Sequence, residues 1–172
     1  MLRACELAVL TALRTRGHSA RLERAVLAFT RAGEHGALWQ ALCAAGVVLD
    51  RRRRALYLRA MRTVALAYLA NIALKYVVRR RRPVLEGLPA LSSTVTSLSF
   101  PSAHSTTSFA AARVLTGPGA FPRAPVYALA KAMALSRVYA GVHYPTDIAA
   151  GAALGTALAE LLAAPRANGG RA

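Results

Sequence analysis

Two side chains toward the C-terminal end of the sequence, His143 and Asp147, have the types and the spacing of a nucleophilic pair. Pro145 lies between them and suits the first turn of a helix, where its missing N–H group is not needed. Asp147 then falls in that first turn, where its carboxylate can accept a hydrogen bond from one imidazole nitrogen. The other nitrogen keeps a lone pair, as a nucleophilic or general-base histidine requires. A loop followed by a capping aspartate is the simpler interpretation.

Three cationic side chains occur beside this pair or in an earlier stretch. Lys75 is expected near the end of a helix, and Arg82, followed by Pro83, is expected just beyond that end. Both side chains are long enough to meet over a single anion. Arg137 precedes His143 closely and adds a fork-shaped guanidinium that suits an oxyanion.

The stretch from Pro101 to His104 predicts the start of another helix. The backbone N–H groups of Ser102 and Ala103 would be unpaired there and would point along the positive end of the helix dipole, which favours an anion. Ser102 adds a hydroxyl donor, and His104 is close enough to act on the same anion. A helix start without a ligand is the simpler alternative.

These groups together match the needs of a phosphoryl group, because its transfer spreads negative charge over oxygens that fixed donors stabilise. We expect His143 to be the nucleophile, Asp147 its support, and His104 the acid for the leaving oxygen. A metal-dependent phosphatase would need several carboxylate or histidine ligands, and only Glu86 and Asp147 lie near these stretches. We therefore expect a reaction that uses no metal and no other cofactor.

Three motifs carry a resemblance to a known family: Lys75-x6-Arg82-Pro83, Pro101-Ser102-Ala103-His104 and Ser136-Arg137-x5-His143-x3-Asp147. They resemble the signature motifs of the type 2 phosphatidic acid phosphatase superfamily, lipid phosphatases that share a site with vanadium haloperoxidases. The resemblance spans residues 55–164 and implies an all-helical membrane bundle. It implies a phosphohistidine on His143 and proton donation by His104. It also implies phosphate contacts from five residues: Lys75, Arg82, Ser102, Ala103 and Arg137.

One position departs from the family pattern, because Ala103 stands where the family usually has glycine. Alanine keeps its backbone N–H group, so phosphate binding is retained if the local φ is negative. If φ had to be positive, alanine would cost about 1 kcal/mol. We expect activity to be retained.

The elements that must carry these motifs are predicted to be helices of one domain. The length of 172 residues suits one domain. The apolar segments, together with the bundle that the family resemblance implies, predict an all-α polytopic transmembrane bundle with about five membrane segments. Those segments are expected at residues 36–49, 55–78, 101–116, 124–138 and 145–164, with a loop at 84–100. Within the single domain, residues 1–35 are expected to form an amphipathic interfacial segment, residues 36–164 the helical core, and residues 165–172 a flexible tail. A solvated basic tail is the alternative for the N-terminal segment.

The composition favours a membrane protein over a nucleic-acid-binding protein. Apolar residues make up 55% of the chain, which carries a net charge of +16. A soluble nucleic-acid-binding protein can be as basic but is rarely as apolar, so no nucleic-acid partner is expected. Arginine-rich loops between apolar membrane segments account for both values. The ionisable residues of the motifs lie at segment ends, which share one membrane face if the segments alternate in direction.

Two further features concern the packing of the bundle. Gly151 and Gly155 form a small-residue step that suits close helix packing in lipid, although coincidence in an alanine-rich helix is the alternative. Glu160 is expected to pair with Lys131 or Arg113, since charges within membrane helices usually find partners.

The expected activity is hydrolysis of a phosphomonoester or diphosphate on a lipid carrier, by a multi-pass protein of a cell membrane, with a bacterial inner membrane favoured. Similarity to small actinobacterial members of the family makes decaprenylphosphoryl-5-phosphoribose the leading candidate substrate. Undecaprenyl diphosphate and phosphatidylglycerophosphate are the rivals. Two other classes stay open: a lipid phosphotransferase, and a non-enzymatic protein that binds anionic lipid.

Overall fold

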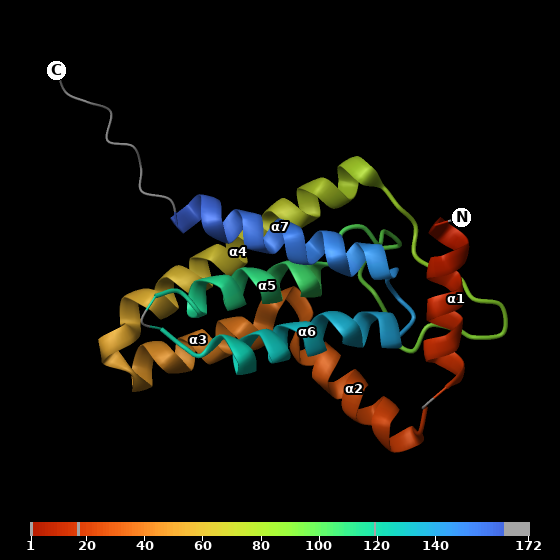
Figure 1. Cartoon of the computed structure of the whole chain (residues 1–172), viewed down its shortest axis with the longest axis horizontal. Helices are drawn as coiled ribbons and strands as arrows, with labels where there is room; N and C mark the ends of the chain where they lie inside the picture. The colour runs from red at the N-terminus through yellow and green to blue at the C-terminus, as the bar shows by residue number, and fades with distance from the viewer. Residues whose placement is uncertain (1, 17, 119, 164–172) are drawn as a thin grey trace.

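The computed structural model describes residues 2–16, 18–118 and 120–163, in which helices are joined by loops and short 3₁₀ turns (Figure 1). The helices are α1 (Leu2–Thr15), α2 (Ala20–Ala32), α3 (Ala37–Leu49), α4 (Arg54–Val78), α5 (Ala103–Leu115), α6 (Arg123–Tyr139) and α7 (Pro145–Ala163), and the 3₁₀ turns are Glu34–Gly36 and Arg51–Arg53. The all-α prediction is therefore confirmed for the described residues, and α3 to α7 correspond to the five expected segments. The expected tail at 165–172 lies outside the described residues.

The start of α5 differs from the prediction. Ser102 is extended, with φ −73° and ψ 119°, so the helix begins at Ala103 and not at Pro101. The N–H group of Ser102 donates to the backbone carbonyl of Asp147 over 3.0 Å. That bond ties the chain to α7 just before α5 begins.

Helix α5 occupies the middle of the bundle and contacts α4, α6 and α7 (Figure 1). Two glycines of α7 allow the closest approach. A Cβ on Gly155 would lie 2.1 Å from the carbonyl oxygen of Thr106, and one on Gly151 would lie 2.7 Å from that of Ser102. Neither position has room for a side chain, so the predicted small-residue packing step is confirmed. The start of α5 is thereby held against the start of α7.

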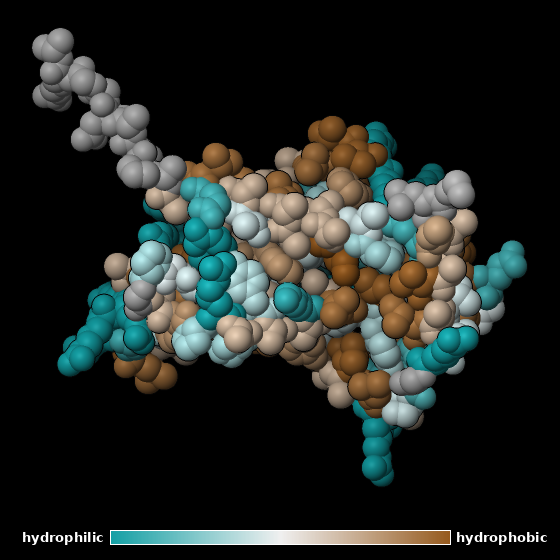
Figure 2. All heavy atoms as spheres, viewed as in Figure 1, coloured by the Kyte–Doolittle hydropathy of each residue, from teal (hydrophilic) through white to brown (hydrophobic). Residues whose placement is uncertain are grey.

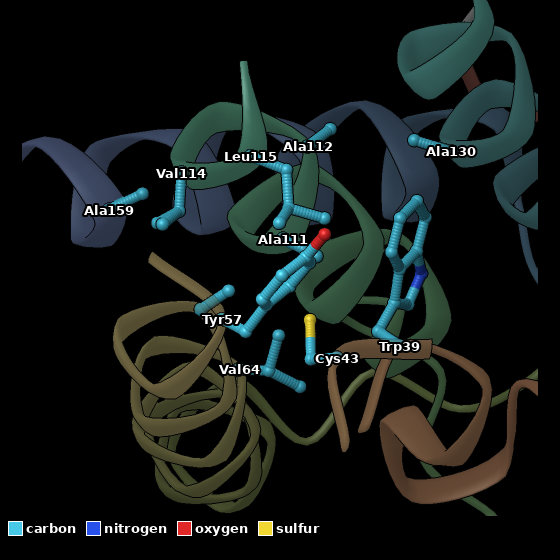
Figure 3. Close-up of a cluster of buried hydrophobic side chains, with 11 residues drawn as sticks. Trp39, Cys43, Tyr57, Val64, Ala111, Ala112, Val114, Leu115, Ala130 and Ala159 are labelled. Atoms are coloured by element: carbon cyan, nitrogen blue, oxygen red, sulfur yellow. The ribbon is translucent and has the colours of Figure 1, made fainter. Parts of the chain in front are cut away.

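The main apolar core lies between α3, α4 and α5 (Figure 3). Cys43 of α3 lies beside Tyr57 and Val64 of α4, whereas the Trp39 ring extends toward Ala130 of α6. The indole N–H of Trp39 donates to the Ser108 hydroxyl over 2.8 Å, which satisfies the one polar group that the tryptophan buries. The core is completed mostly by small residues: Ala60, Ala111, Ala112, Val114, Leu115, Ala130 and Ala159.

Two helical stretches have the length and composition to cross a membrane, residues 51–78 and 145–163. Helices α3 and α5 have 13 residues each, which rise about 20 Å against a hydrocarbon core of about 30 Å. Figure 2 shows hydrophilic side chains gathered toward the ends of the molecule, with more apolar surface between them. At one end, Glu160 pairs with Arg113, which confirms the expected partnership.

Helix α1 lies across the other end of the bundle, beside the loops that precede α5 and α7 (Figure 1). Leu10 is fully buried and packs with Val138 and Tyr144. Arg14 donates to the carbonyl oxygen of Pro89 over 2.7 Å. One face of α1 therefore packs against other parts of the protein. These contacts lie at the end of the bundle that holds the motif residues.

Candidate active site

A cavity of about 420 Å³ lies where α4 ends, α5 begins and the chain turns from α6 into α7. Two sequence-predicted residues, Ser102 and Asp147, are fully buried and lie beside the residues that line this cavity. The structure thus brings the three motifs together from separate parts of the chain. The predicted site residues that line the cavity directly are Lys75, Arg82, Ala103, His104, Arg137 and His143.

The His143 imidazole lies in the loop between α6 and α7 and is 3% exposed. Its Nδ1 lies 3.4 Å from Oδ2 of Asp147, in the first turn of α7. This distance is longer than a normal hydrogen bond, and catalytic hydrogen bonds are often long before substrate binds. Nδ1 has no hydrogen-bond partner within the described residues. Asp147 therefore faces one nitrogen, and the second nitrogen, Nε2, is left for chemistry.

The Asp147 carboxylate is held by donors other than the histidine. The backbone N–H of Tyr144 donates to Oδ2 over 2.8 Å, and Nη1 of Arg80 donates to Oδ1 over 2.9 Å. The Arg80 guanidinium also lies 3.9 Å from the centre of the Tyr144 ring. A fully buried carboxylate without a partner would be strongly destabilising, so Arg80 fixes both the charge and the orientation of Asp147.

Arg80 is a site residue that the sequence analysis missed. Its Nη2 donates to Oε2 of Glu6 over 2.6 Å, and the backbone N–H of Thr146 donates to Oε1 over 3.2 Å. Burial alone would raise the pKa of Glu6, but the hydrogen bonds from Thr146 and Arg80 lower it below the usual value. Arg80 is 74 residues from Glu6 and 67 from Asp147, so no local spacing reveals the chain of contacts. Glu6, the single acidic residue of α1, is the local feature of the sequence that could have pointed to these contacts.

Arg82 contacts the nitrogen that the nucleophile would use. Its Nη1 lies 3.1 Å from Nε2 of His143 and donates to the Val142 carbonyl over 2.8 Å, while its Nε donates to the Thr96 carbonyl over 2.8 Å. Burial lowers the pKa of Arg82 to about 10, an effect that the Asp147 charge partly opposes. The guanidinium therefore stays charged at neutral pH and lies where an anion in contact with His143 would be.

The pKa of His143 is lowered to about 3, chiefly because burial disfavours the charged imidazolium. The nearby Asp147 carboxylate opposes this shift, and the positive charges of Arg82 and Arg137 add to it. His143 is therefore neutral at physiological pH, with an Nε2 lone pair that can attack.

The second histidine, His104, has a different environment. Its Nε2 lies 2.9 Å from the backbone carbonyl of Thr30, in α2. A carbonyl oxygen only accepts, so Nε2 carries a proton. The remaining nitrogen, Nδ1, then carries a proton only when the ring is an imidazolium. His104 is thus oriented by α2, a helix that the sequence analysis did not assign to the site.

Thr30 also holds the third motif and was missed by the sequence analysis. Its hydroxyl accepts from Nη1 of Arg137 over 2.8 Å and from the Ser136 hydroxyl over 3.0 Å. Arg137 is 3% exposed, and its Nε has no hydrogen-bond partner within the described residues. The guanidinium is therefore positioned from one side and retains a free donor for an oxyanion.

Lys75 differs from the expectation of a phosphate contact. Its ammonium donates to the backbone carbonyls of Leu98, Ser99 and Pro101 over 3.2, 3.3 and 3.0 Å. These bonds use all three of its donors and hold the loop that leads into α5. Lys75 therefore braces that loop, and its side chain lines the cavity.

The helix-start donors are also arranged differently from the prediction. The N–H of Ser102 is not free, because it donates to the Asp147 carbonyl over 3.0 Å. Its hydroxyl is buried and has no hydrogen-bond partner in the described part of the chain. Ala103 is the first residue of α5 and is not among the described residues with positive φ. The alanine therefore carries no left-handed backbone penalty, and the residue lines the cavity.

No group of three or more His, Cys, Asp or Glu side chains that could hold a metal ion is found in the described residues. The cavity lining combines guanidinium groups, an ammonium and imidazoles with only one carboxylate, Glu34. Such a lining suits an oxyanion that carries several negative charges.

The comparisons with known proteins define the class. Residues 56–168 match the family model of the PAP2 superfamily. The chain belongs to the PAP2 superfamily. It is a phosphatase of that family, and so a phosphoric ester hydrolase.

Relatives of known name include decaprenylphosphoryl-5-phosphoribose phosphatases of two mycobacteria. The chain is 43% identical over 124 residues to that of Mycolicibacterium smegmatis, a match covering 72% of this chain and 68% of the relative. It is 38% identical over 130 residues to that of Mycobacterium tuberculosis, covering 76% and 72%. The solved transmembrane PAP2 type phosphatidylglycerolphosphate phosphatase from Bacillus subtilis shares the fold, with a TM-score of 0.76 and 22% identity over 94% of this chain and 84% of that one.

Proposed function

We propose that this protein removes a phosphate group from a membrane lipid carrier through a phosphohistidine on His143, without a metal ion. The observation that carries the proposal is the environment of His143. The imidazole is neutral and backed by Asp147, and it faces a cavity that Arg82 and Arg137 also line. These residues supply the nucleophile and the fixed positive charge that phosphoryl transfer needs.

In the first step, a phosphomonoester enters the cavity and Arg82 turns from Nε2 of His143 to the phosphoryl oxygens. The Nε2 lone pair attacks phosphorus, and the bond from phosphorus to the ester oxygen breaks. Asp147 stays ionised and stabilises the positive charge that develops on the ring. Arg82 and Arg137 stabilise the charge on the equatorial oxygens.

The leaving oxygen takes its proton from His104. The bond from Nε2 of His104 to the Thr30 carbonyl is retained, so the transferred proton comes from Nδ1 of the imidazolium. A bound phosphate dianion favours that charged form of His104. The substrate thus helps to charge the acid that completes its own cleavage.

In the second step, water attacks the phosphohistidine. Neutral His104 accepts a proton from the water at Nδ1, and the bond from phosphorus to Nε2 of His143 breaks. Inorganic phosphate leaves, and both histidines return to their starting forms. If the cavity excludes other alcohols once the first product has left, water is the group that accepts the phosphoryl group.

The substrate that the relatives favour is decaprenylphosphoryl-5-phosphoribose, dephosphorylated during the synthesis of cell-wall arabinan precursors. Two named relatives at about 40% identity carry this activity in their names, and each match covers most of both chains. The PAP2 motifs occur in enzymes with several lipid substrates, so it is the identity to these relatives that supports the substrate.

The same proposal places the chain in the bacterial inner membrane as a multi-pass protein with about five membrane segments. The two candidate spans and the likeness to a transmembrane phosphatase support it. The shorter helices α3 and α5 would then cross as parts of a packed bundle, with the cavity near one membrane face.

A phosphate-release assay tests the proposal. The protein in detergent is given decaprenylphosphoryl-5-phosphoribose, undecaprenyl diphosphate and phosphatidylglycerophosphate, each with and without EDTA. We expect release of inorganic phosphate that EDTA does not reduce and that is fastest with the phosphoribose lipid. Loss of activity in EDTA contradicts the metal-free mechanism, and transfer of phosphate to an added alcohol in place of water identifies a phosphotransferase.

A further inference from the structure

The cavity is larger than the catalytic groups require. Its volume of about 420 Å³ falls in the range of about 300–1,000 Å³ that is typical of pockets for whole small molecules. The catalytic side chains account for part of its lining only. Glu34, His35 and Tyr68 line it as well, and the proposed reaction uses none of them.

The turn between α2 and α3 presents two of these side chains. His35 has a left-handed backbone, with φ 55° and ψ 16°, and so has Gly36, with φ 77° and ψ 15°. A left-handed non-glycine residue is unfavourable by about 1–2 kcal/mol, and such strain occurs at functional sites more often than elsewhere. A side chain at Gly36 would approach Cγ1 of Val64 to 2.9 Å, so the turn is held close to α4.

The polar atoms of this turn are available to a ligand. Nδ1 of His35 lies 2.6 Å from the Tyr68 hydroxyl, which leaves its Nε2 without a partner within the described residues. The Glu34 carboxylate makes no hydrogen bond or ion pair to any described residue, and both Glu34 and His35 are exposed. The three side chains thus offer a carboxylate, a ring nitrogen and a phenol at the cavity.

The charge of Glu34 decides which ligand group can lie there. Glu34 lines the same cavity as Arg137, so its carboxylate adjoins the phosphate-binding part of that cavity. A second phosphate beside the reacting one would be repelled by Glu34. A hydroxyl group would donate to the carboxylate and accept from the ring or the phenol.

We propose that Glu34, His35 and Tyr68 form a hydroxyl-binding subsite, which selects phosphomonoesters of a polyhydroxylated group over lipid diphosphates. The inference rests on the proposed function and adds the part of the substrate that gives selectivity. The phosphate is held among the histidines and arginines, and the vicinal hydroxyls of the esterified sugar face the turn between α2 and α3.

The test compares two substrates that differ only in those hydroxyls. A short-chain polyprenylphosphoryl-ribose 5-phosphate and its 2,3-dideoxy counterpart are assayed with the wild type, Glu34→Gln and Tyr68→Phe. Glu86→Gln removes an exposed carboxylate outside the cavity lining and is the matched control. Hydrogen bonds to a charged group are worth about tenfold or more in discrimination.

We expect the wild type and Glu86→Gln to prefer the hydroxylated substrate about tenfold in kcat/KM, and Glu34→Gln and Tyr68→Phe to lose most of that preference. Equal losses on both substrates would overturn the subsite and assign Glu34 a charge-balancing role. An unchanged preference in both variants would overturn it too, while leaving the phosphatase proposal intact.

The wild-type substrate panel separates the two proposals. If phosphatidylglycerophosphate is the best substrate, the phosphoribose assignment fails, but the subsite is tested in the same way with the glycerol hydroxyl present or absent. If undecaprenyl diphosphate is the best substrate, the phosphoribose assignment and the subsite both fail.

Discussion

Two buried regions of this molecule differ in how their polar atoms are satisfied. In the core between α3 and α5, Trp39 is 2% exposed and its single polar group has a hydrogen-bond partner at 2.8 Å. Around the cavity, His143 is 3% exposed and Asp147 is fully buried, yet among the described residues the nearest partner of His143 Nδ1, Oδ2 of Asp147, is 3.4 Å away. The buried tryptophan of the core thus has its polar group satisfied by the protein, whereas the catalytic histidine does not.

The same contrast extends to the groups around the histidine. The hydroxyl of Ser102 and Nε of Arg137 are buried and have no hydrogen-bond partner within the described residues. Buried polar atoms without partners are rare in native structures because each is destabilising. Four of the seven such atoms in the described residues lie around the cavity, on Asn71, Ser102, Arg137 and His143. This concentration indicates a region organised for an anionic ligand more than for maximum stability.

The largest expected effect is a loss of phosphatase activity at the site with little change in the stability of the protein. His143→Ala removes the proposed nucleophile, so phosphate release should fall by at least about 10³-fold, because catalytic groups that act as a unit show losses of this size or more. Its melting temperature in detergent should change little, since a neutral ring with an incomplete hydrogen bond is removed. His18→Ala, at a histidine outside the cavity lining, is the control and should keep its activity. Activity retained in His143→Ala would refute the mechanism.

The pH dependence of stability should also differ between the regions, because the core near Trp39 has no side chain that titrates between pH 7 and pH 4. Unfolded His143 binds a proton near its ordinary pKa of 6.5, whereas the folded pKa is lowered to about 3. Between these values the unfolded state binds more protons, so stability is complete above about pH 6.5 and is lost as the pH falls toward 3. At pH 4 the free energy of unfolding is lowered by about 3 kcal/mol because of His143, since each pKa unit corresponds to about 1.4 kcal/mol.

Melting temperatures in detergent from pH 7 to pH 4 measure this effect. We expect His143→Gln to lose less stability than the wild type over this interval, because glutamine does not titrate. Parallel curves would show that His143 is not a buried neutral imidazole.

The packing of α7 against α5 connects the core with the site. A single added methyl group, at Gly155, tests how close this packing is. Gly155→Ala places a Cβ 2.1 Å from the Thr106 carbonyl oxygen, so the helices must separate. Overpacking of this kind costs about 1–3 kcal/mol, and it should lower both the melting temperature and the turnover because α5 carries His104. Gly117→Ala is the control, since its Cβ meets no atom closer than 3.4 Å. Equal behaviour of the two variants would contradict the close packing.

A smaller effect is expected where the site is supported from α1. Arg80→Gln leaves the Asp147 and Glu6 carboxylates without their shared cation, so His143 loses part of its orientation. We expect kcat to fall by about 10–100-fold, as is common when a group that orients a catalytic or metal-bound histidine is removed. Arg80→Lys keeps the charge but cannot bridge both carboxylates, and should retain part of the rate. A change in KM alone would place Arg80 in substrate binding.

The helices and the nearby pairs could be predicted from the sequence because their patterns are local. His143 and Asp147 are four residues apart and meet in one turn, and the small-residue step in α7 has helical spacing. The partners of Arg80 and Thr30 could not be predicted, since they join α1 and α2 to residues as much as 107 positions away. The free N–H of Ser102 was wrongly predicted because the Asp147 carbonyl, a long-range partner, accepts from it.

The most direct measurement is isolation of the covalent intermediate. The protein is mixed with substrate carrying ³²P in the leaving phosphate, quenched in alkali, digested, and its labelled peptide is sequenced. The mechanism predicts a label that is lost in acid, lies on His143, and is absent from His143→Gln. Turnover at the normal rate with no labelled protein, or with the label on another residue, would contradict it.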